Sequence, residues 1–99
     1  MITIRSAAAP GEARELTAEG HAEYNPGDDI VCAAVSCLLQ TLREVLENGG
    51  HAREIEAEAR KGRMRVRARC DAVGAAAFDF AQIGLEILAQ TYPECVQFA

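Results

Sequence analysis

Alternating apolar and polar residues predict two strands at the start of the chain. Within MITIRS, residues 1–6, the isoleucines alternate with polar side chains, which is the two-residue period of a strand with one buried face. A Pro-Gly pair at residues 10–11 marks a turn. The alternation returns over residues 15–23, where the apolar face consists of Leu16, Ala18, Gly20 and Ala22. His21 belongs to the opposite, polar face, near the end of this second strand.

The period changes to that of a helix after Asp28. Apolar side chains then recur every three or four residues, and this stripe consists of Val31, Ala34, Val35, Leu38, Leu42, Val45 and Leu46. Residues 48–50, Asn-Gly-Gly, should end the helix because they accept left-handed backbone angles. Asp28 or Asp29 is the expected N-cap, since a short side-chain oxygen can accept a hydrogen bond from an amide of the first turn. Cys32 then falls in that first turn.

Residues 53–70 predict a β-hairpin that turns at Lys61 and Gly62. With that turn, one face of the hairpin pairs opposite charges and the other pairs apolar side chains. The expected pairs are Arg60 with Arg63, Glu58 with Arg65, Glu56 with Arg67, Glu54 with Arg69, Ala59 with Met64, Ala57 with Val66, and Ile55 with Ala68. The segment RKGRMRVRAR resembles an RNA-binding sequence in isolation. The acidic partners across the hairpin favour a solvated, charge-balanced sheet face instead.

A second helix follows the hairpin and ends before Pro93. Its predicted buried stripe consists of Val73, Ala76, Ala77, Phe80, Ile83, Gly84, Ile87 and Leu88. Residues 94–99 could add a short edge strand. The expected fold is therefore α+β: a two-layer β-β-α-β-β-α arrangement with a mostly antiparallel sheet and two helices on one face. The length of 99 residues suits one core, so we expect a single domain over residues 1–99.

Composition indicates a thin core. Hydrophobic residues make up 49% of the chain, but 19 residues are alanine and none is tryptophan. Small side chains bury little apolar area, and burial of a further apolar face in a partner would compensate, so we expect a homodimer. The net charge of −5 gives no general attraction to nucleic acid or to anionic membranes, and neither is an expected partner.

The sequence also bears on compartment and cofactors. The amino terminus lacks a charged region followed by a long apolar stretch, and no uninterrupted apolar run approaches the roughly 18 residues of a membrane-spanning helix. We therefore expect a cytoplasmic protein whose four cysteines are reduced thiols. No C-x-x-C pair occurs, so a zinc site would need scattered ligands such as Cys32, Cys37, His21 and His51. We expect no metal and no other cofactor.

The segment GHAEYNPGDDIVCAAVS, residues 20–36, could support thiol chemistry. Amides and the dipole at a helix start favour a thiolate at Cys32, and a nearby imidazolium of His21 would favour it further. The same amides could form an oxyanion hole. The intervening residues could fold over the helix start as a substrate-gating loop, which consists of Glu23, Tyr24, Asn25, Pro26 and Gly27.

Each of these residues also has an ordinary structural interpretation. A cysteine on a helix is commonly a small buried residue, and a lone histidine is commonly a surface group. Ser36 would then donate a hydrogen bond to the carbonyl of Cys32, four residues earlier. The remaining cysteines, Cys37, Cys70 and Cys95, have apolar neighbours in the sequence and are interpreted as packing residues.

The same segment resembles the signature of the ribosomal-processing cysteine protease family, Prp, in which G-H-A precedes a glycine-containing loop and G-x-D-I-V-C-A-x-x-S. The matching residues are Gly20, His21, Ala22, Gly27, Asp29, Ile30, Val31, Cys32, Ala33 and Ser36. The resemblance implies a homodimeric cysteine endopeptidase with Cys32 as nucleophile and His21 as base. It implies as substrate the N-terminal extension of a large-subunit ribosomal protein, the twenty-seventh. Asp29 is then either a cap or the residue that orients His21, and Ser36 is a supporting residue.

Two other functions stay open at this point. A noncatalytic ribosome-associated protein could hold the same peptide without cutting it. A metal-binding protein would bind zinc through Cys32 and His21. Incubation of the peptide with the protein, followed by mass spectrometry, separates the first from an enzyme, and elemental analysis tests the second.

Overall fold

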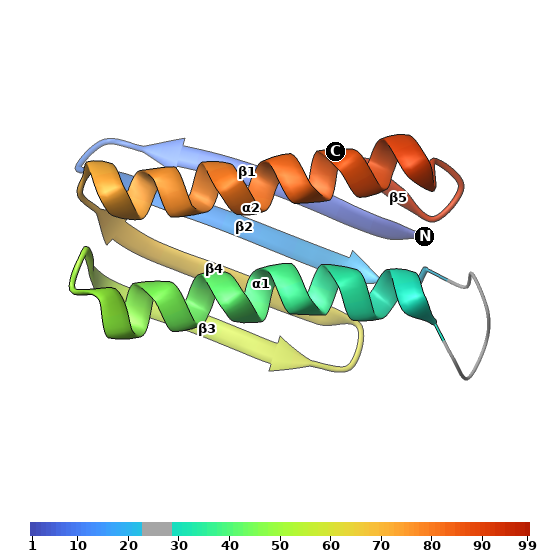
Figure 1. Ribbon diagram of the computed structural model, residues 1–99, viewed down its shortest axis with the longest axis horizontal. Helices are drawn as coiled ribbons and strands as arrows, with labels where there is room; N and C mark the ends of the chain where they lie inside the picture. Colours follow the sequence, from blue (N-terminus) through green and yellow to red (C-terminus); the bar gives the residue numbers. More distant parts are fainter. Residues whose placement is uncertain (23–28) are drawn as a thin grey trace.

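The protein consists of a five-stranded sheet with two helices packed side by side on one of its faces (Figure 1). This computed structural model describes residues 1–22 and 29–99. In chain order, the elements are β1 (Ile2–Ala9), β2 (Ala13–Gly20), α1 (Ile30–Gly49), β3 (Ala52–Arg60), β4 (Arg63–Cys70), α2 (Ala72–Thr91) and β5 (Val96–Phe98). The predicted α+β class and element order are confirmed, and so is the short edge strand after the second helix.

The strands lie in the order β3-β4-β2-β1-β5. All neighbours are antiparallel except β1 and β5, which are parallel. β2 therefore lies at the centre of the sheet, and β4 of the hairpin pairs with it directly. Apolar side chains on one face of the strands form the core with the helices; the buried strand residues of this core are Ile2, Ile4, Leu16, Ala18, Val66, Ala68, Cys70 and Val96.

Helix α1 begins and ends as its sequence predicts. Asp29 is the N-cap, and Gly50 caps the other end with a left-handed φ of 72°. The buried residues are Val31, Val35, Leu39, Leu42 and Leu46. Leu39 was not in the predicted stripe, and Val45, which was, is exposed. The buried stripe is thus rotated slightly from the predicted one.

The predicted buried face of α2 is wrong. Gly74, Phe78, Ala81 and Leu85 face the core, whereas the predicted Val73, Phe80, Ile83 and Ile87 are exposed. Apolar residues occur on nearly every side of this helix, so its periodicity does not select one face. Because residues two apart lie on nearly opposite sides of a helix, burial of Phe78 turns Phe80 toward solvent, where 77% of its surface is exposed.

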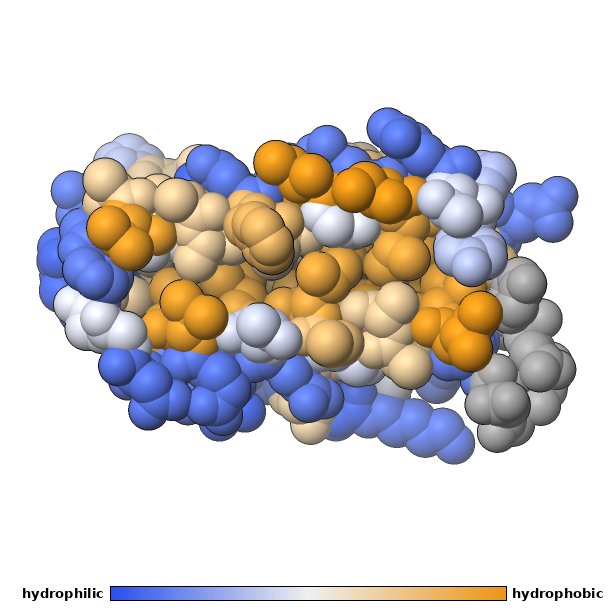
Figure 2. Space-filling model, in the orientation of Figure 1, coloured by the Kyte–Doolittle hydropathy of each residue, from blue (hydrophilic) through white to orange (hydrophobic). Residues whose placement is uncertain are grey.

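By length and composition, α2 could span a membrane. Its mean hydropathy over the most apolar 18 residues is 1.4, and 22% of that stretch is buried inside the protein. The core helix of a soluble protein can have the same properties. One side of α2 here packs on the sheet and on α1, and the other contributes to an apolar surface, which Figure 2 shows running along both helices.

The β3–β4 hairpin has the predicted register near its turn and a different one at its far end. Arg60, Glu58 and Glu56 face Arg63, Arg65 and Arg67, as expected, and Ala57 and Ala59 face Val66 and Met64. Beyond Glu56 the register shifts by one residue, so that Arg53 instead of Glu54 pairs with Arg69, and Ile55 has no partner of its own. The cause is a β-bulge at residues 54–55, where Glu54 adopts a left-handed φ of 53°.

The arginines of β4 are balanced by acids from both neighbouring strands. On the β2 side, Nε of Arg65 lies 2.6 Å from Oε1 of Glu15. On the β3 side, the guanidinium of Arg69 contacts the carboxylate of Glu54 despite the register shift. The hydrogen bond from Arg65 lowers the pKa of Glu15. This sheet face is therefore charge-balanced, which agrees with the solvated-face interpretation of the basic segment rather than with an RNA-binding one.

Candidate active site

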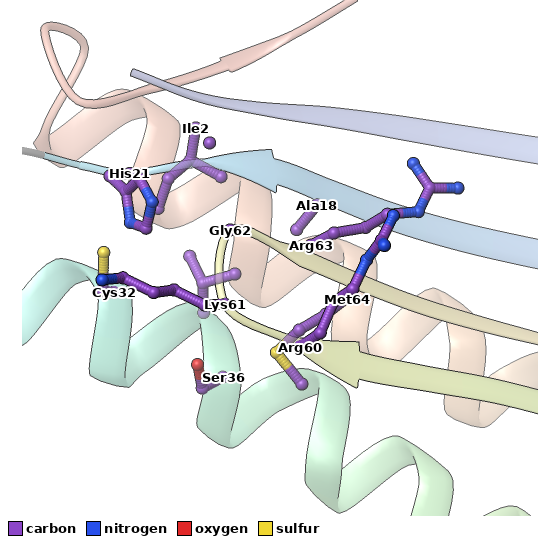
Figure 3. Close-up of a pocket in the computed structure, with 12 residues that line it drawn as sticks. Ile2, Ala18, His21, Cys32, Ser36, Arg60, Lys61, Gly62, Arg63 and Met64 are labelled. Atoms are coloured by element: carbon purple, nitrogen blue, oxygen red, sulfur yellow. The ribbon is translucent and has the colours of Figure 1, made fainter.

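One pocket of about 180 Å³ lies where the end of β2, the start of α1 and the β3–β4 turn meet (Figure 3). Both predicted reactive residues, His21 and Cys32, line it. Its other lining residues are Ile2, Ala18, Gly20, Val35, Ser36, Arg60, Lys61, Gly62, Arg63 and Met64. The structure thus brings together three segments, of which the sequence analysis connected only the first two.

Cys32 lies in the first turn of α1 and is partly exposed. The Asp29 carboxylate accepts hydrogen bonds from the amides of Val31 and Cys32, at 3.0 and 3.1 Å, which is the predicted N-cap. The amide of Ala22, the residue after His21, donates to the Cys32 sulfur with an N···S distance of 3.3 Å. A donor aimed at the sulfur stabilises its anionic form more than its neutral form.

The helix-start amides are not arranged as the oxyanion hole proposed from sequence. The amides of Val31 and Cys32 donate to the Asp29 side chain, and the Ala33 amide donates to the Asp29 carbonyl at 3.1 Å. These three amides therefore already have acceptors inside the protein. Of the backbone amides described at this site, Ala22 is the one that points at the sulfur. Its amide was missed from sequence, although the G-H-A motif contained the residue.

His21 directly follows β2, and close backbone contacts fix its position. Gly20 has a φ of 106°, and a Cβ atom there would collide with the Met1 carbonyl oxygen, so only glycine fits. The Met1 nitrogen in turn donates a hydrogen bond to the His21 carbonyl. In Figure 3 the imidazole and the Cys32 sulfur face each other across the pocket. The sequence placed His21 near the end of the second strand, and the structure has it directly after that strand, with its side chain exposed.

The β3–β4 turn gives the pocket a cationic rim. Arg63 contacts the carboxylates of Glu19 and Glu58, and Arg60 also contacts Glu58. Lys61 has no ion pair among residues 1–22 and 29–99. Two acids thus neutralise part of the rim, and the Lys61 ammonium adds a positive charge to the pocket that contains the thiol.

The other residues singled out from sequence differ in where the structure places them. Ser36 lines the pocket, and within the described chain it does not make the predicted hydrogen bond to the Cys32 carbonyl. Asp29 is the cap, which was one of its two expected roles. The proposed gating loop, Glu23, Tyr24, Asn25, Pro26 and Gly27, lies outside the described residues. The other candidate cap, Asp28, does too.

The remaining cysteines do not join the site. Cys70 and Cys95 are buried as predicted, and burial raises the pKa of the Cys70 thiol. Cys37 is exposed, contrary to its interpretation as a packing residue, because α1 turns that position outward. Residues 1–22 and 29–99 contain no cluster of three histidine, cysteine or acidic side chains that could hold a metal ion. His51 instead forms a pair with Asp71, at 2.8 Å.

Comparison with known proteins places the chain in a family. The model of the cysteine protease Prp family matches residues 1–97. The chain belongs to this family of cysteine peptidases. The resemblance found in residues 20–36 is thereby confirmed and extends over nearly the whole sequence. Among curated proteins, no sequence matches the chain.

Solved structures of Prp have the same fold. The ribosomal processing protease Prp from S. aureus, in complex with a covalently linked product peptide, superposes with a TM-score of 0.86 at 19% identity, covering 99% of this chain and 97% of that one. The same protease with a substrate peptide gives 0.76 at 18% identity, covering 100% and 98%. SMU.848 from Streptococcus mutans gives 0.72 at 28% identity, covering 99% and 91%.

Proposed function

We propose that this chain is a cysteine endopeptidase that removes the N-terminal extension of a large-subunit ribosomal protein, the twenty-seventh, with Cys32 as nucleophile and His21 as base. The observation that carries the proposal is the shared pocket of these two side chains at the start of α1. Membership in the Prp family supports the peptidase chemistry. The S. aureus relative, described as a ribosomal processing protease with bound peptide, supports the class of substrate.

The same imidazole takes up a proton and returns it in each half of the reaction. His21 takes the thiol proton of Cys32, and the sulfur attacks the carbonyl carbon of the scissile peptide bond. The resulting tetrahedral intermediate collapses when His21 returns the proton to the leaving amine, and an acyl-enzyme remains. Water then attacks the acyl carbon after giving a proton to His21. The C–S bond of the second tetrahedral intermediate then breaks, the carboxylate product leaves, and His21 returns its proton to the sulfur, which restores the thiol.

Three local features support the thiolate in this scheme. The sulfur lies at the positive end of the α1 dipole, it accepts a hydrogen bond from the Ala22 amide, and the ammonium of Lys61 belongs to the same pocket. Asp29 opposes them with its negative charge, but its oxygen is engaged by two amides of the helix. The sulfur therefore has the helix start, an amide donor and an ammonium around it, and the one carboxylate nearby is engaged by helix amides.

The test is cleavage of a synthetic peptide that spans the N-terminal extension and the mature start of the ribosomal protein. The wild-type chain should shorten the peptide at one bond, seen by mass spectrometry. Cys32→Ser and Cys32→Ala should abolish the product, and His21→Ala should lower the rate by at least about 100-fold. Cys37→Ser is the matched control, since it alters an exposed cysteine of the same helix and should cleave normally.

Two outcomes would overturn the proposal. Cleavage at the wild-type rate by both Cys32→Ala and His21→Ala would exclude the dyad. A peptide that stays intact but co-purifies with the wild-type chain would identify a noncatalytic peptide-binding protein instead.

We further propose that the protein acts as a cytoplasmic homodimer, with the exposed apolar face of the helices as the contact between copies. This face contains Val45, Phe80, Ile83 and Ile87 and includes an apolar groove of about 530 Å³ between α1 and α2. Figure 2 shows it as a continuous apolar surface with hydrophilic side chains at its margins. A contiguous apolar patch on a small protein is typical of a protein contact. Sedimentation tests whether the protein is a homodimer, and cell fractionation tests whether it is cytoplasmic.

A further inference from the structure

We propose that Gly62 is a positioning residue for His21: its lack of a side chain lets the imidazole lie against the β3–β4 turn, in the orientation that faces Cys32. The inference rests on the proposed role of His21 as base. It assigns to the hairpin turn, 41 positions beyond His21 in sequence, a part in the reaction that no motif indicates.

The backbone ties this turn to the segment that carries His21. The Gly20 amide donates to the Gly62 carbonyl at 2.9 Å, and one residue earlier Glu19 pairs with Arg63 in the β2–β4 ladder. The residue before the imidazole and the turn are therefore held in fixed register. Movement of the turn relative to His21 would break a sheet hydrogen bond.

The space between the turn and the imidazole is too small for a side chain. A Cβ atom built on Gly62 would lie 3.2 Å from Nε2 of His21 and 3.7 Å from its Cε1. Contacts below 3.4 Å are tighter than ordinary van der Waals contact, so a methyl group would displace the ring by a few tenths of an ångström. The Nε2 edge of the ring thus rests against the bare backbone of residue 62.

This displacement matters because proton transfer between a thiol and an imidazole depends on a hydrogen-bonding distance. Misplacement of about 1 Å in an active site can cost about 100-fold in rate, so a shift of a few tenths should cost about tenfold or less. Figure 3 shows the imidazole, the Cys32 sulfur and the Gly62 turn around the same pocket. A ring pushed from the turn leaves the position from which it faces the sulfur.

The chain offers a matched control for the backbone. Gly62 has a φ of +79°, which itself disfavours any side chain, and Gly50, the C-cap of α1, has a φ of +72°. No atom lies within 4 Å of a Cβ built on Gly50. Gly50→Ala therefore carries the same type of backbone strain as Gly62→Ala without the contact to His21.

The experiment measures alkylation of Cys32 by iodoacetamide across pH 5–9 in a Cys37→Ser background, which removes the exposed competing thiol. Peptide mapping confirms the modified residue. His21→Ala first defines the part of the rate that depends on the imidazole. Near neutral pH, Gly62→Ala should lose most of the imidazole-dependent alkylation rate, a fall of about tenfold. Gly50→Ala should keep the imidazole-dependent rate. Peptide cleavage should fall in parallel.

A double-mutant cycle separates positioning from general damage. In the His21→Ala background, Gly62→Ala should slow alkylation no further, because its effect passes through the missing ring. If Gly62→Ala fails to fold, as judged by thermal unfolding, Gly62→Asn and Gly50→Asn replace the alanine pair, since asparagine tolerates left-handed angles better.

The possible failures can be told apart. Equal profiles for Gly62→Ala and Gly50→Ala, or an equal effect of Gly62→Ala with and without His21, would overturn the positioning role and leave the proposed function standing. An unchanged profile in His21→Ala alone would overturn the dyad, and this inference with it.

Discussion

The Ala22 amide donates a hydrogen bond to the Cys32 sulfur, and the amide of Cys32 itself donates to Asp29. Cys32 is therefore held at two points, its sulfur by the amide of the residue that follows His21 and its own amide by the cap of α1. Both contacts depend on the exact start of the helix, because a shift of one residue would carry Cys32 around to another face. The cap thus contributes to the geometry of the site as well as to the stability of the helix.

The hydrogen bonds that Asp29 accepts as the cap of α1 can be tested separately from its negative charge. Asp29→Ala removes the acceptor of two amides and should lower the free energy of unfolding by about 1 kcal/mol. Asp29→Asn keeps an oxygen in the same place and should lose much less. Urea unfolding of both variants measures the difference. Equal losses would show that the hydrogen bonds to Val31 and Cys32 are not the stabilising contribution.

The two glycines of α2 should respond differently to substitution by alanine. At Gly74 an added Cβ would lie 2.5 Å from the His51 carbonyl oxygen and 2.9 Å from Cys70 Cβ, atoms that are fixed in the sheet and its connection. Gly74→Ala should therefore destabilise the protein by about 1–3 kcal/mol, although alanine is intrinsically better in a helix by about 1 kcal/mol.

Gly84→Ala is the matched variant, since its Cβ would meet only the flexible methyl groups of Leu38, at 2.8 and 2.9 Å. The gain in helix propensity should offset the side-chain adjustment, leaving a change within about 1 kcal/mol. Thermal unfolding of the two variants decides the matter. A Gly74→Ala protein as stable as the Gly84→Ala protein would contradict the close packing of α2 against the strand ends.

The ion pair of Glu15 with Arg65 predicts a pH-dependent stability. The hydrogen bond from Arg65 lowers the pKa of Glu15 from its usual value of 4.5, so the folded chain releases this proton more readily than the unfolded chain. Stability from this group is present above pH 4.5 and is lost as the pH falls through the lowered pKa. Glu15→Gln should therefore be less stable than wild type at pH 7, by at most about 1 kcal/mol, and the difference should be smaller at pH 3.

Unfolding by urea at both pH values measures this effect, and Glu94→Gln is its control. Glu94 is exposed and, in the described part of the chain, makes no ion pair. Its variant should follow the wild-type curve at both pH values. A Glu15→Gln deficit that persists unchanged at pH 3 would rule out the carboxylate as its source.

The proposed dimer contact predicts the effect of a charge on the helix face. Phe80→Asp should leave the fold of each copy intact, because this side chain is 77% exposed. It should shift the protein to monomers, since a buried unpaired carboxylate opposes association. Analytical ultracentrifugation measures the change, and Gln40→Asp, an exposed position on α1, is the control. A monomeric wild-type protein would contradict the proposed dimer, and an unaffected Phe80→Asp dimer would place the contact elsewhere.

Local sequence patterns predicted the fold well wherever one periodicity dominated. Residue type and position narrowed the cap to Asp28 or Asp29, of which the structure has Asp29, and the turn at Lys61 and Gly62 fixed three charged pairs correctly. The face of α2 could not be predicted, because Phe78 and Phe80 are equally apolar and only packing against the sheet selects between them. The bulge at Glu54 carries no glycine or proline that would signal it.

The site was predictable to the extent that it is local. His21 ends one element and Cys32 begins the next, so a short connection brings them to the same end of the molecule. Their neighbour Gly62 was unpredictable, because its position depends on β4 pairing with β2 rather than with β1. That pairing is set by long-range packing, which periodicity does not encode.

The bulge in β3 separates the two ends of the hairpin. Residues 56–60 keep one alignment with β4 as far as the turn, and residues 52–53 follow another toward α1. A change in chain length near Ala52 can therefore be absorbed at Glu54 without sliding the turn along His21. The hairpin can vary where it leaves the helix while the end that borders the thiol keeps its place.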